Sequence, residues 1–583
     1  MEARLLDLGF DVDSYGAAQG SPQPLASDCL HLPPSPCASD SEDMLEGGPW
    51  PCEPYPENIP RAAAFSDTDQ ECDVFCTEEA KEGPFPDDFG GLLIPRCIFD
   101  APTSRTLAWM SQKSGITPKL SPENHCNATS FGSLNDDFPR KVFCPLPPKE
   151  EASSLLYEYL HNFNSVCPLF EQAKLVSLFN QDSLDVALRT PAFWASANVV
   201  LALGIAFRIK NGSVTQSEHQ KSWLFIKNAF GTFHDLCLGQ PDVWSIQALL
   251  GMSLFFLGTM SAEPCCFLAT AAIRMSHQLG LGKGEDGVSL PPKDVEHRRN
   301  IFWIAYCLDR EISLRFGKPP TQNDDDMSIN LPTEQPINSA RIIPSMYRHV
   351  KFDAFRAHCQ LATIKGQLYK DLYSATAKAR PLSEIITSVG QLDEMLQNWR
   401  EDLPSEYQPG SQGLPSLPQS SISLALLYLH CSYFNCIIAM HRLIASRGIR
   451  TADDLVKRYQ DISRSTSPPN APRIFASESL CANAARDSIK LMKYIPEGHV
   501  SLVGFLVHYP IVALATLSSS IIRNPLDASR LTDMRLIDQV ETFLSSLVVS
   551  VPNQAIAQLR TYCANHRAAA KAAVQKTVQC CGR

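Results

Sequence analysis

The sequence predicts an all-α protein, with one large multi-helix domain preceded by a mostly disordered, acidic and proline-rich N-terminal tail. Apolar residues recur at three- and four-residue spacing through most of residues 150–576. Alternating apolar and polar runs, which are typical of strands, are almost missing. Acidic residues and prolines concentrate near the N-terminus. We therefore predict a tail over residues 1–140 and a helical domain over residues 145–577.

The tail is defined by its charge. Residues 1–90 contain 20 acidic and 3 basic residues, a net charge of −17, so residues 91–583 carry +6 within the chain's total of −11. So high a charge, combined with many prolines, predicts disorder because too little apolar surface can be buried to offset the ordering entropy. Acidic residues alternate with large apolar ones, as in LLDLGFDVD from Leu5. That composition is typical of an activation segment, and a solvated linker stays open as the alternative.

Thirteen helices are predicted in the body. Turn-forming segments such as GKGEDG from Gly282, PGSQGLPSLPQS from Pro409 and RSTSPPNAPR from Arg464 separate them. The predicted helices span residues 151–162, 191–210, 217–238, 242–257, 264–279, 294–316, 344–373, 382–401, 422–445, 476–494, 499–522, 532–549 and 553–575.

The helix predicted over residues 294–316 has the clearest pattern. Its apolar stripe includes Ile301, Ile304, Leu308 and Ile312, widened by three aromatic residues, so most of its circumference is expected to be buried. Prolines precede it, and Gly317 follows it. Four charged side chains lie on or beside the stripe, and because an unpaired buried charge is costly we expect them to form ion pairs or to reach solvent: Arg298, Arg299, Asp309 and Arg310.

This helix and the segment after it resemble the middle homology region of fungal zinc-cluster transcription factors of the Zn2Cys6 type. The resemblance covers residues 145–522 and is looser from Leu392 onwards. The signature residues, which we expect to be structural, are Arg298, Arg299, Phe302, Trp303, Leu308, Asp309, Arg310, Gly317, Lys318, Pro319, Pro320 and the acidic run Asp324 to Asp326.

The resemblance implies a fungal transcriptional regulator specific to one pathway or gene cluster, and an activator in particular. It also implies a nuclear protein, with a cytoplasmic location left open, and a DNA-binding partner or a coactivator. A homodimer and a small-molecule effector are compatible with it. The residues that would contact DNA are not assigned, and the densest basic cluster, His297 to Arg299, belongs to the predicted helix.

The zinc cluster of that family is not expected in this chain. It requires six cysteine thiolates, with two pairs separated by two residues. None of the 20 cysteines forms such a pair. We therefore expect no zinc or other cofactor in these 583 residues and only indirect or weak contact with DNA, through a partner or through a zinc-cluster segment outside them. Cysteines within apolar helices, such as Cys307, Cys431 and Cys436, are interpreted as small buried hydrophobic residues in a reducing compartment.

A helical enzyme that metabolises small molecules, or a ligand sensor with the same fold, is the alternative. Asp324 to Asp326 approach a magnesium-binding pattern, but the closing carboxylate is replaced by Pro332. The sequence contains no nucleophile elbow, phosphate loop or His-Glu-x-x-His motif. We therefore predict a protein that is not an enzyme, without catalytic or metal-binding residues.

The longest apolar stretch, residues 501–522, is long enough to cross a bilayer. Its serines, together with His508 and Pro510, favour a buried core helix instead. We expect no association with a membrane.

Overall fold

The computed structural model describes most of the chain from Arg140 onwards. The predicted tail, residues 1–140, lies outside the described residues except for Arg140, so its disorder and its role stay predictions. The described residues are 140–180, 188, 190–208, 215–259, 262–284, 290–334, 342–344, 351–410, 421–447, 471–495, 504–550 and 554–581.

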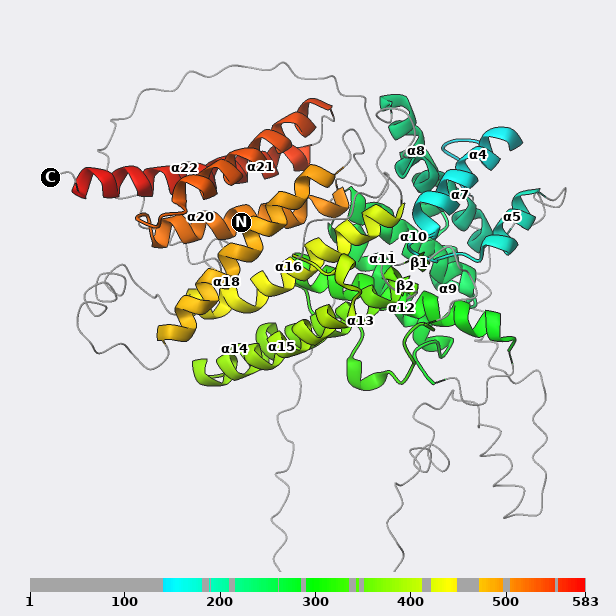
Figure 1. Ribbon diagram of the computed structural model, residues 1–583. Helices are drawn as coiled ribbons and strands as arrows, with labels where there is room; N and C mark the ends of the chain where they lie inside the picture. Colours follow the sequence, from blue (N-terminus) through cyan, green and yellow to red (C-terminus); the bar gives the residue numbers. More distant parts are fainter. Residues whose placement is uncertain are drawn as a thin grey trace, which may run out of the picture. The chain divides into compact units, whose positions relative to one another are not determined.

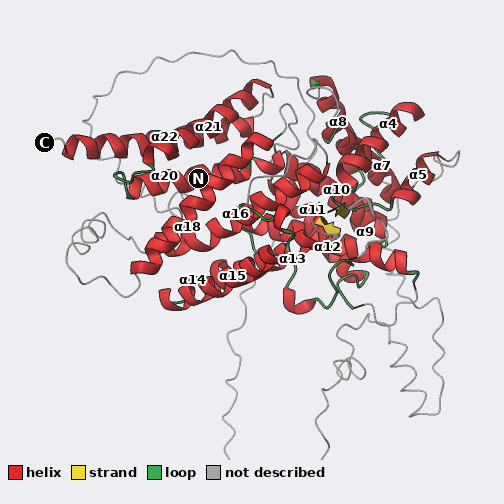
Figure 2. Cartoon of the chain, in the orientation of Figure 1, coloured by secondary structure: helices red, strands yellow, loops and turns green. Residues whose placement is uncertain are grey.

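Within these residues the fold is almost entirely helical (Figure 2), which confirms the predicted all-α class. The longer helices are labelled in Figure 1, and short 3-10 or π-helical turns extend several of them. Their bounds are α4 Lys149–Tyr159, α5 Gln172–Asn180, α7 Pro191–Ala206, α8 Gln216–Phe230, α9 Phe233–Leu238, α10 Val243–Gly258, α11 Ala262–Gln278, α12 Pro292–Phe316, α13 Ala354–Leu368, α14 Ala375–Lys378, α15 Leu382–Asp402, α16 Ser421–Arg447, α18 Ala471–Lys490, α20 His508–Arg523, α21 Arg530–Ser550 and α22 Gln554–Cys581.

Between residues 172 and 238 the structure differs from the prediction in two places. Helix α5 is nine residues long and was not predicted, since so short a segment shows little periodicity. The helix predicted over residues 217–238 is interrupted at Gly231 and Thr232, which separate α8 from α9. Glycine is a poor helix former, and the Thr232 hydroxyl donates back to the Ala229 carbonyl at 2.9 Å, so the chain turns there.

The helix predicted over residues 344–373 does not begin at residue 344, so this predicted start was wrong. Two short strands, β1 Ile342–Pro344 and β2 Lys351–Asp353, pair antiparallel before it, with Ile343 opposite Phe352. The helix α13 begins at Ala354 because the Asp353 carboxylate accepts hydrogen bonds from the backbone N–H groups of Phe355 and Arg356. An N-cap of this strength fixes the helix start ten residues later than the apolar pattern suggested.

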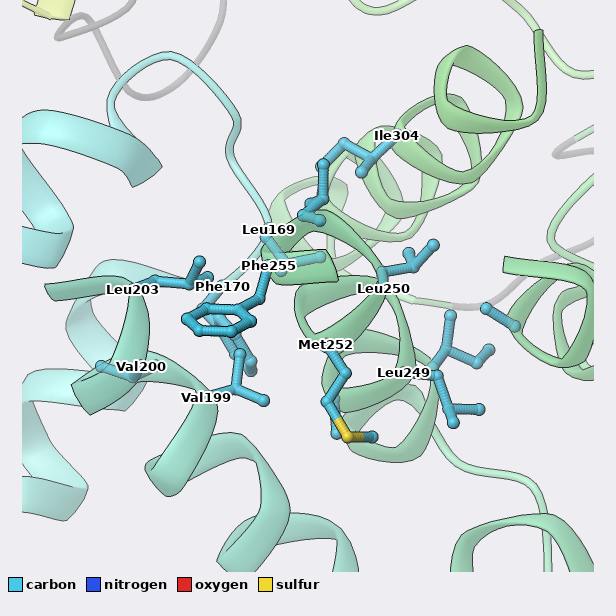
Figure 3. Packing of buried hydrophobic residues seen from close by; sticks show 14 of the residues in the cluster. Leu169, Phe170, Val199, Val200, Leu203, Leu249, Leu250, Met252, Phe255 and Ile304 are labelled. Atoms are coloured by element: carbon cyan, nitrogen blue, oxygen red, sulfur yellow. The ribbon is translucent and has the colours of Figure 1, made fainter. Parts of the chain in front are cut away.

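Two clusters of buried apolar side chains form the interior. The N-terminal core comes mainly from α4, α5, α7, α8, α10, α11 and α12. Figure 3 shows part of it, where Val199 and Leu203 lie on the side of α7 that is turned towards Met252 and Phe255. The C-terminal core comes from α13, α15, α16, α18, α20, α21 and α22.

Helix α13 contributes to both cores. Its Phe355 and Cys359 pack in the N-terminal core, whereas Leu361 and Leu368 pack in the C-terminal core. Helix α12 packs directly against α13. The signature segment therefore lies where the two cores meet.

Two described helical spans, Leu424–Ala445 and Gly504–Arg523, are long and apolar enough to cross a membrane by length and composition. Most of the residues in each are buried within the fold. The second span includes most of the apolar stretch interpreted above as a core helix, and its Leu514 and Leu517 are fully buried in the C-terminal core.

Candidate functional site

Helix α12 carries most of the signature residues. Pro292 occupies its first turn, and Asp294 adds a favourable negative charge there. The helix ends at Gly317, whose φ of +64° lies in the left-handed region that glycine adopts without strain. This reversal directs the Lys318-Pro319-Pro320 segment back along the last turns of the helix, towards Asp309.

Asp309 holds this returning segment. Its carboxylate accepts hydrogen bonds from the backbone N–H of Thr321, at 2.9 and 3.0 Å, and from that of Gln322, at 3.1 Å. Burial raises the pKa of Asp309 despite these donors and the nearby Arg310. The buried carboxylate thus accepts the first two backbone N–H groups that follow the prolines.

Arg310 is almost fully buried and surrounded by acceptors. Its Nη1 donates to Asp309 Oδ2 at 3.0 Å, and its Nη2 donates to the Gln322 carbonyl at 2.8 Å and to Asp324 Oδ1 at 2.6 Å. The guanidinium also lies 4.3 Å from the ring centroid of Tyr306, whose hydroxyl donates to Asp324 at 2.8 Å. These four side chains form a connected group, which we call the Arg310 network: Tyr306, Asp309, Arg310 and Asp324.

Helix α13 approaches this network through Gly366. A Cβ atom at this position would lie 2.7 Å from Asp324 Oδ2, 2.9 Å from Arg310 Nε and 3.0 Å from the Tyr306 hydroxyl. Only a residue without a side chain lets the α13 backbone come this close. The sequence analysis did not single out Gly366; a lone glycine within an apolar helical pattern was the available signal.

A side chain at Gly366 would collide with the Arg310 network and should lower the stability of the fold. Gly366→Ala should destabilise the protein by about 1–3 kcal/mol, because the added methyl group displaces a hydrogen-bonded carboxylate. Gly390→Ala is the matched control, since Gly390 is exposed on α15 and has no atom within 4 Å of the built Cβ. It should stabilise by about 0.5–1 kcal/mol. Chemical unfolding of the two variants measures both effects, and equal shifts would contradict the close approach.

A second buried ion pair links α12 to α13. Lys365 Nζ donates to Glu311 Oε2 at 2.7 Å, and both side chains are almost fully buried. The Tyr509 hydroxyl of α20 donates to the other carboxylate oxygen at 3.1 Å. Burial alone would raise the pKa of Glu311, but Lys365 and Arg315 outweigh it and lower this pKa to about 2. Glu311 is therefore a buried carboxylate anion bound by groups from two other helices.

The other signature residues also serve packing and backbone contacts. Arg298 Nη2 donates to the Leu279 carbonyl at 3.0 Å, Trp303 Nε1 donates to the Asn330 carbonyl at 2.8 Å, and Phe302 packs over Gly282. Arg299 and Leu308 are buried, whereas Lys318 and Pro319 are exposed and Pro320 is half-buried. Asp326 is exposed and accepts a hydrogen bond from Asn323 at 3.3 Å.

The acidic run forms a 3-10 turn, Asp324–Asp326, with divergent side chains. Asp324 points into the Arg310 network, while Asp325 makes an exposed ion pair with Lys370 at 3.3 Å. No cluster of three or more metal-ligating side chains occurs within the part of the chain that the structure describes. The interior contains an apolar cavity, which is a different kind of candidate site.

A cavity of about 170 Å³ lies beside α12, between the two cores. Its wall is predominantly apolar and aromatic, with side chains from α10, α12, α13 and α16 and from the segments that follow α4 and α7. The polar groups among its lining residues include Cys307, Glu311 and His358. Sequence reasoning did not locate this cavity, because its walls come from helices that are distant in the chain.

The buried His297, near the start of α12, should make the stability of the fold depend on pH. Its Nε2 lies 3.0 Å from the Gln247 amide nitrogen, and burial lowers its pKa from 6.5 to about 4. Between these values the unfolded chain binds a proton that the folded chain does not, so stability is lost as the pH falls. We expect His297→Gln to remove about 1–2 kcal/mol of the stability loss between pH 7 and pH 5.

Chemical unfolding at both pH values measures this difference. His161→Gln is the control for the loss of one imidazole, because His161 is exposed and lies outside α12. An unaltered pH dependence in His297→Gln would contradict the assigned role of His297.

The chain is similar to known fungal proteins. Residues 156–401 match the fungal specific transcription factor domain. Proteins named ABC-transporter-regulating transcription factor from Aspergillus fumigatus and Aspergillus oryzae are 37% and 38% identical to this chain over 477 residues. The match covers 81% of this chain and 53% of each relative, so the chain spans about half the length of these proteins.

A third relative is matched over most of both chains. The Fusaridione A cluster transcription factor fsdR from Fusarium heterosporum is 28% identical over 465 residues, which cover 78% of this chain and 84% of the relative. The matched domain contains the whole of α12, the Arg310 network and the cavity-facing residues of α13. The resemblance found in the sequence is confirmed, since residues 156–401 match the fungal specific transcription factor domain and all three relatives are named as transcription factors.

Proposed function

We propose that this protein is a fungal transcriptional regulator in which the helical body transmits regulation to an acidic activation segment. The observation that carries this proposal is the family domain over residues 156–401, joined to a segment of charge −17 within residues 1–90. The names of the relatives support a regulator and not the alternative of an enzyme. Nuclear localisation and activation, as opposed to repression, are parts of the proposal.

The body is suited to a regulatory role because its two cores are coupled by buried charges. The Glu311–Lys365 pair and the Tyr509 hydroxyl connect α12, α13 and α20. Arg315 adds a further link, since its Nη2 donates to the Gly504 carbonyl at 2.7 Å. A perturbation at the junction of the cores therefore changes contacts in both.

We propose that DNA is recognised by a partner, with a zinc-cluster segment outside these 583 residues as the alternative. The 583 residues contain no pair of cysteines at the two-residue spacing of a zinc cluster. In the body, Arg298 donates to a backbone carbonyl and Arg310 is enclosed by acceptors, so these arginines are committed to the fold. We propose contact with DNA through a DNA-binding partner protein and contact with the transcription machinery through a coactivator that binds the acidic segment.

Target genes follow from the relatives. Two of them are named as regulators of ABC transporters. We propose that transporter genes are among the targets of this chain as well. Transcript levels of such genes should fall when the gene for this protein is deleted and should recover when it is restored.

A reporter assay tests the activator role. The full chain, fused to a heterologous DNA-binding domain, should raise expression from a reporter that carries the matching operator. Replacing Leu5, Leu6, Leu8 and Phe10 by alanine should lower this output, because a coactivator groove binds the apolar side chains of such segments. Replacing Pro33, Pro34 and Pro36 by alanine is the control, with output expected to be unchanged. Output no higher than that of the DNA-binding domain alone would refute activation.

Effector sensing is a second candidate role. The observation that favours it is the apolar cavity of about 170 Å³ at the junction of the two cores. A ligand that binds only the folded state raises its stability, so ligand-dependent thermal stabilisation of the purified chain tests this role.

A further inference from the structure

One cysteine in the wall of the cavity, Cys307, has a lowered pKa. Cys307, on α12, lines this cavity, and Cys307 Sγ lies 3.8 Å from Sγ of Cys359 on α13. Burial of the thiol opposes its ionisation, but Cys359, His358 and Lys365 outweigh burial and lower the pKa of Cys307 to about 5. Cys167 lines the same cavity, yet burial raises its pKa. Cys307 is therefore the nucleophile that this environment favours.

His358 supplies a second polar group. It also lines the cavity, and its Nδ1 is buried without a hydrogen-bond partner among the described residues. The ring is held by Tyr428, whose centroid lies 5.2 Å away. A histidine that lines the same cavity as a thiol can accept the thiol proton and return it to a bound molecule.

The cavity limits the size and charge of its occupant. A dry cavity of about 150 Å³ is sufficient to bind benzene, so 170 Å³ admits a molecule with about one six-membered ring. Phe207, Phe355 and Leu254 provide apolar walls, which disfavour charged compounds. The carboxylate of Glu311 is already bound by Lys365 and Tyr509, so it is not available to a cationic ligand.

Part of the cavity wall reaches the surface. Asn162, Val166 and Leu424 line the cavity and are each partly exposed to solvent. We take these residues as the place where a small apolar molecule enters.

We propose that this cavity is an effector site for small uncharged electrophiles of the α,β-unsaturated carbonyl class and that Cys307 captures them covalently. The inference rests on the proposed regulatory function, which it deepens by naming the class of effector. Cys307 Sγ forms a bond to the β-carbon of the enone, and the C=C π electron pair moves to the α-carbon. His358 accepts the proton as the S–H bond of Cys307 breaks and delivers it to the α-carbon. No group leaves, and no further reactant is needed.

The adduct would act where the two cores meet. Cys307 neighbours Leu308 and Glu311 on the cavity face of α12, and Glu311 connects α13 and α20. A molecule bonded to Cys307 occupies space beside these contacts. The capture of an electrophile is thereby coupled to the packing of both cores.

Labelling of the purified full chain tests the proposal. Cyclohex-2-enone is the probe, and peptide mass spectrometry at successive times measures the modification of each cysteine. Cys237 is the internal reference, because it is exposed and its pKa is raised. At pH 6 we expect Cys307 to react about tenfold faster, since its larger thiolate fraction outweighs the lower intrinsic nucleophilicity of a less basic thiolate.

Two controls separate capture in the cavity from general reactivity. Cyclohexanone has nearly the same shape but no C=C bond, so it should protect Cys307 without modifying it. Ala425→Phe fills the cavity from α16 and leaves Cys307 in place, so it should slow labelling of Cys307 but not of Cys237. Far-UV circular dichroism verifies that this variant is folded.

Labelling of Cys307 no faster than that of Cys237 would overturn the proposal. So would an absence of protection by cyclohexanone, or an undiminished rate in folded Ala425→Phe. The measurement uses the purified chain without DNA or transcription. Its failure is thus distinct from a failure of the reporter assay, which would refute activation and leave the reactivity of Cys307 unaffected.

Discussion

Replacing Arg310 by methionine should destabilise the protein by about 3–5 kcal/mol, the effect expected when one partner of a buried charge group is removed. The substitution leaves the carboxylates of Asp309 and Asp324 without the guanidinium that joins them. It also removes the contact with the Tyr306 ring and the hydrogen bond to the Gln322 carbonyl. Methionine is chosen because it keeps most of the apolar volume of the side chain.

Chemical unfolding of the full chain measures this loss. Lys293→Met is the matched control, since Lys293 lies on the same helix and pairs with Glu171 at 2.5 Å, but is exposed. Because Glu171 keeps Lys174 as a second partner at 2.8 Å, the loss of the exposed Lys293 should cost less than about 1 kcal/mol. If Arg310→Met and Lys293→Met cost the same, the Arg310 network does not hold the segment after α12 in place.

Replacing Lys365 by methionine should cost a similar amount, about 3–5 kcal/mol, because Glu311 is left as an unpaired buried carboxylate. Glu311→Gln/Lys365→Met, which removes both charges, should cost less than the sum of the two single substitutions. The difference is the coupling between the two side chains, and we expect about 1–3 kcal/mol for direct contact at 2.7 Å.

A double-mutant cycle measures this coupling from the unfolding free energies of the four proteins. Arg380 and Glu384 provide the comparison, since they form an exposed pair within one segment at 3.0 Å. Their coupling should be about 0.3–0.5 kcal/mol. A coupling for Glu311 and Lys365 as small as this would show that the junction of the cores does not depend on their charges.

Local sequence signals were sufficient for α12. Its predicted bounds, residues 294–316, differ from Pro292–Phe316 only in the first turn, and Gly317 ends it as expected. Proline and glycine determine such boundaries through the backbone itself. By contrast, α5 and the β1–β2 pair are too short to produce a periodic pattern, and they form because Phe179, Ile343 and Phe352 are buried by the rest of the fold.

The site was less accessible to sequence reasoning. Asp309, Arg310 and Asp324 lie close together in the sequence, so the signature pattern was sufficient to single them out. The partners Lys365 and Tyr509 are 54 and 198 residues from Glu311 in the chain, and no local pattern connects residues so far apart. Cys307 was interpreted as a small buried hydrophobic residue. It is buried, but the proximity of Cys359, His358 and the cavity became visible only in three dimensions.

The central claim, that this protein regulates genes, is tested most directly by mapping where the tagged chain associates with chromatin in the fungus. The account predicts enrichment at a limited set of promoters, with altered transcript levels of the adjacent genes when the protein is removed. A uniform signal along the genome, together with unchanged transcripts, would contradict it.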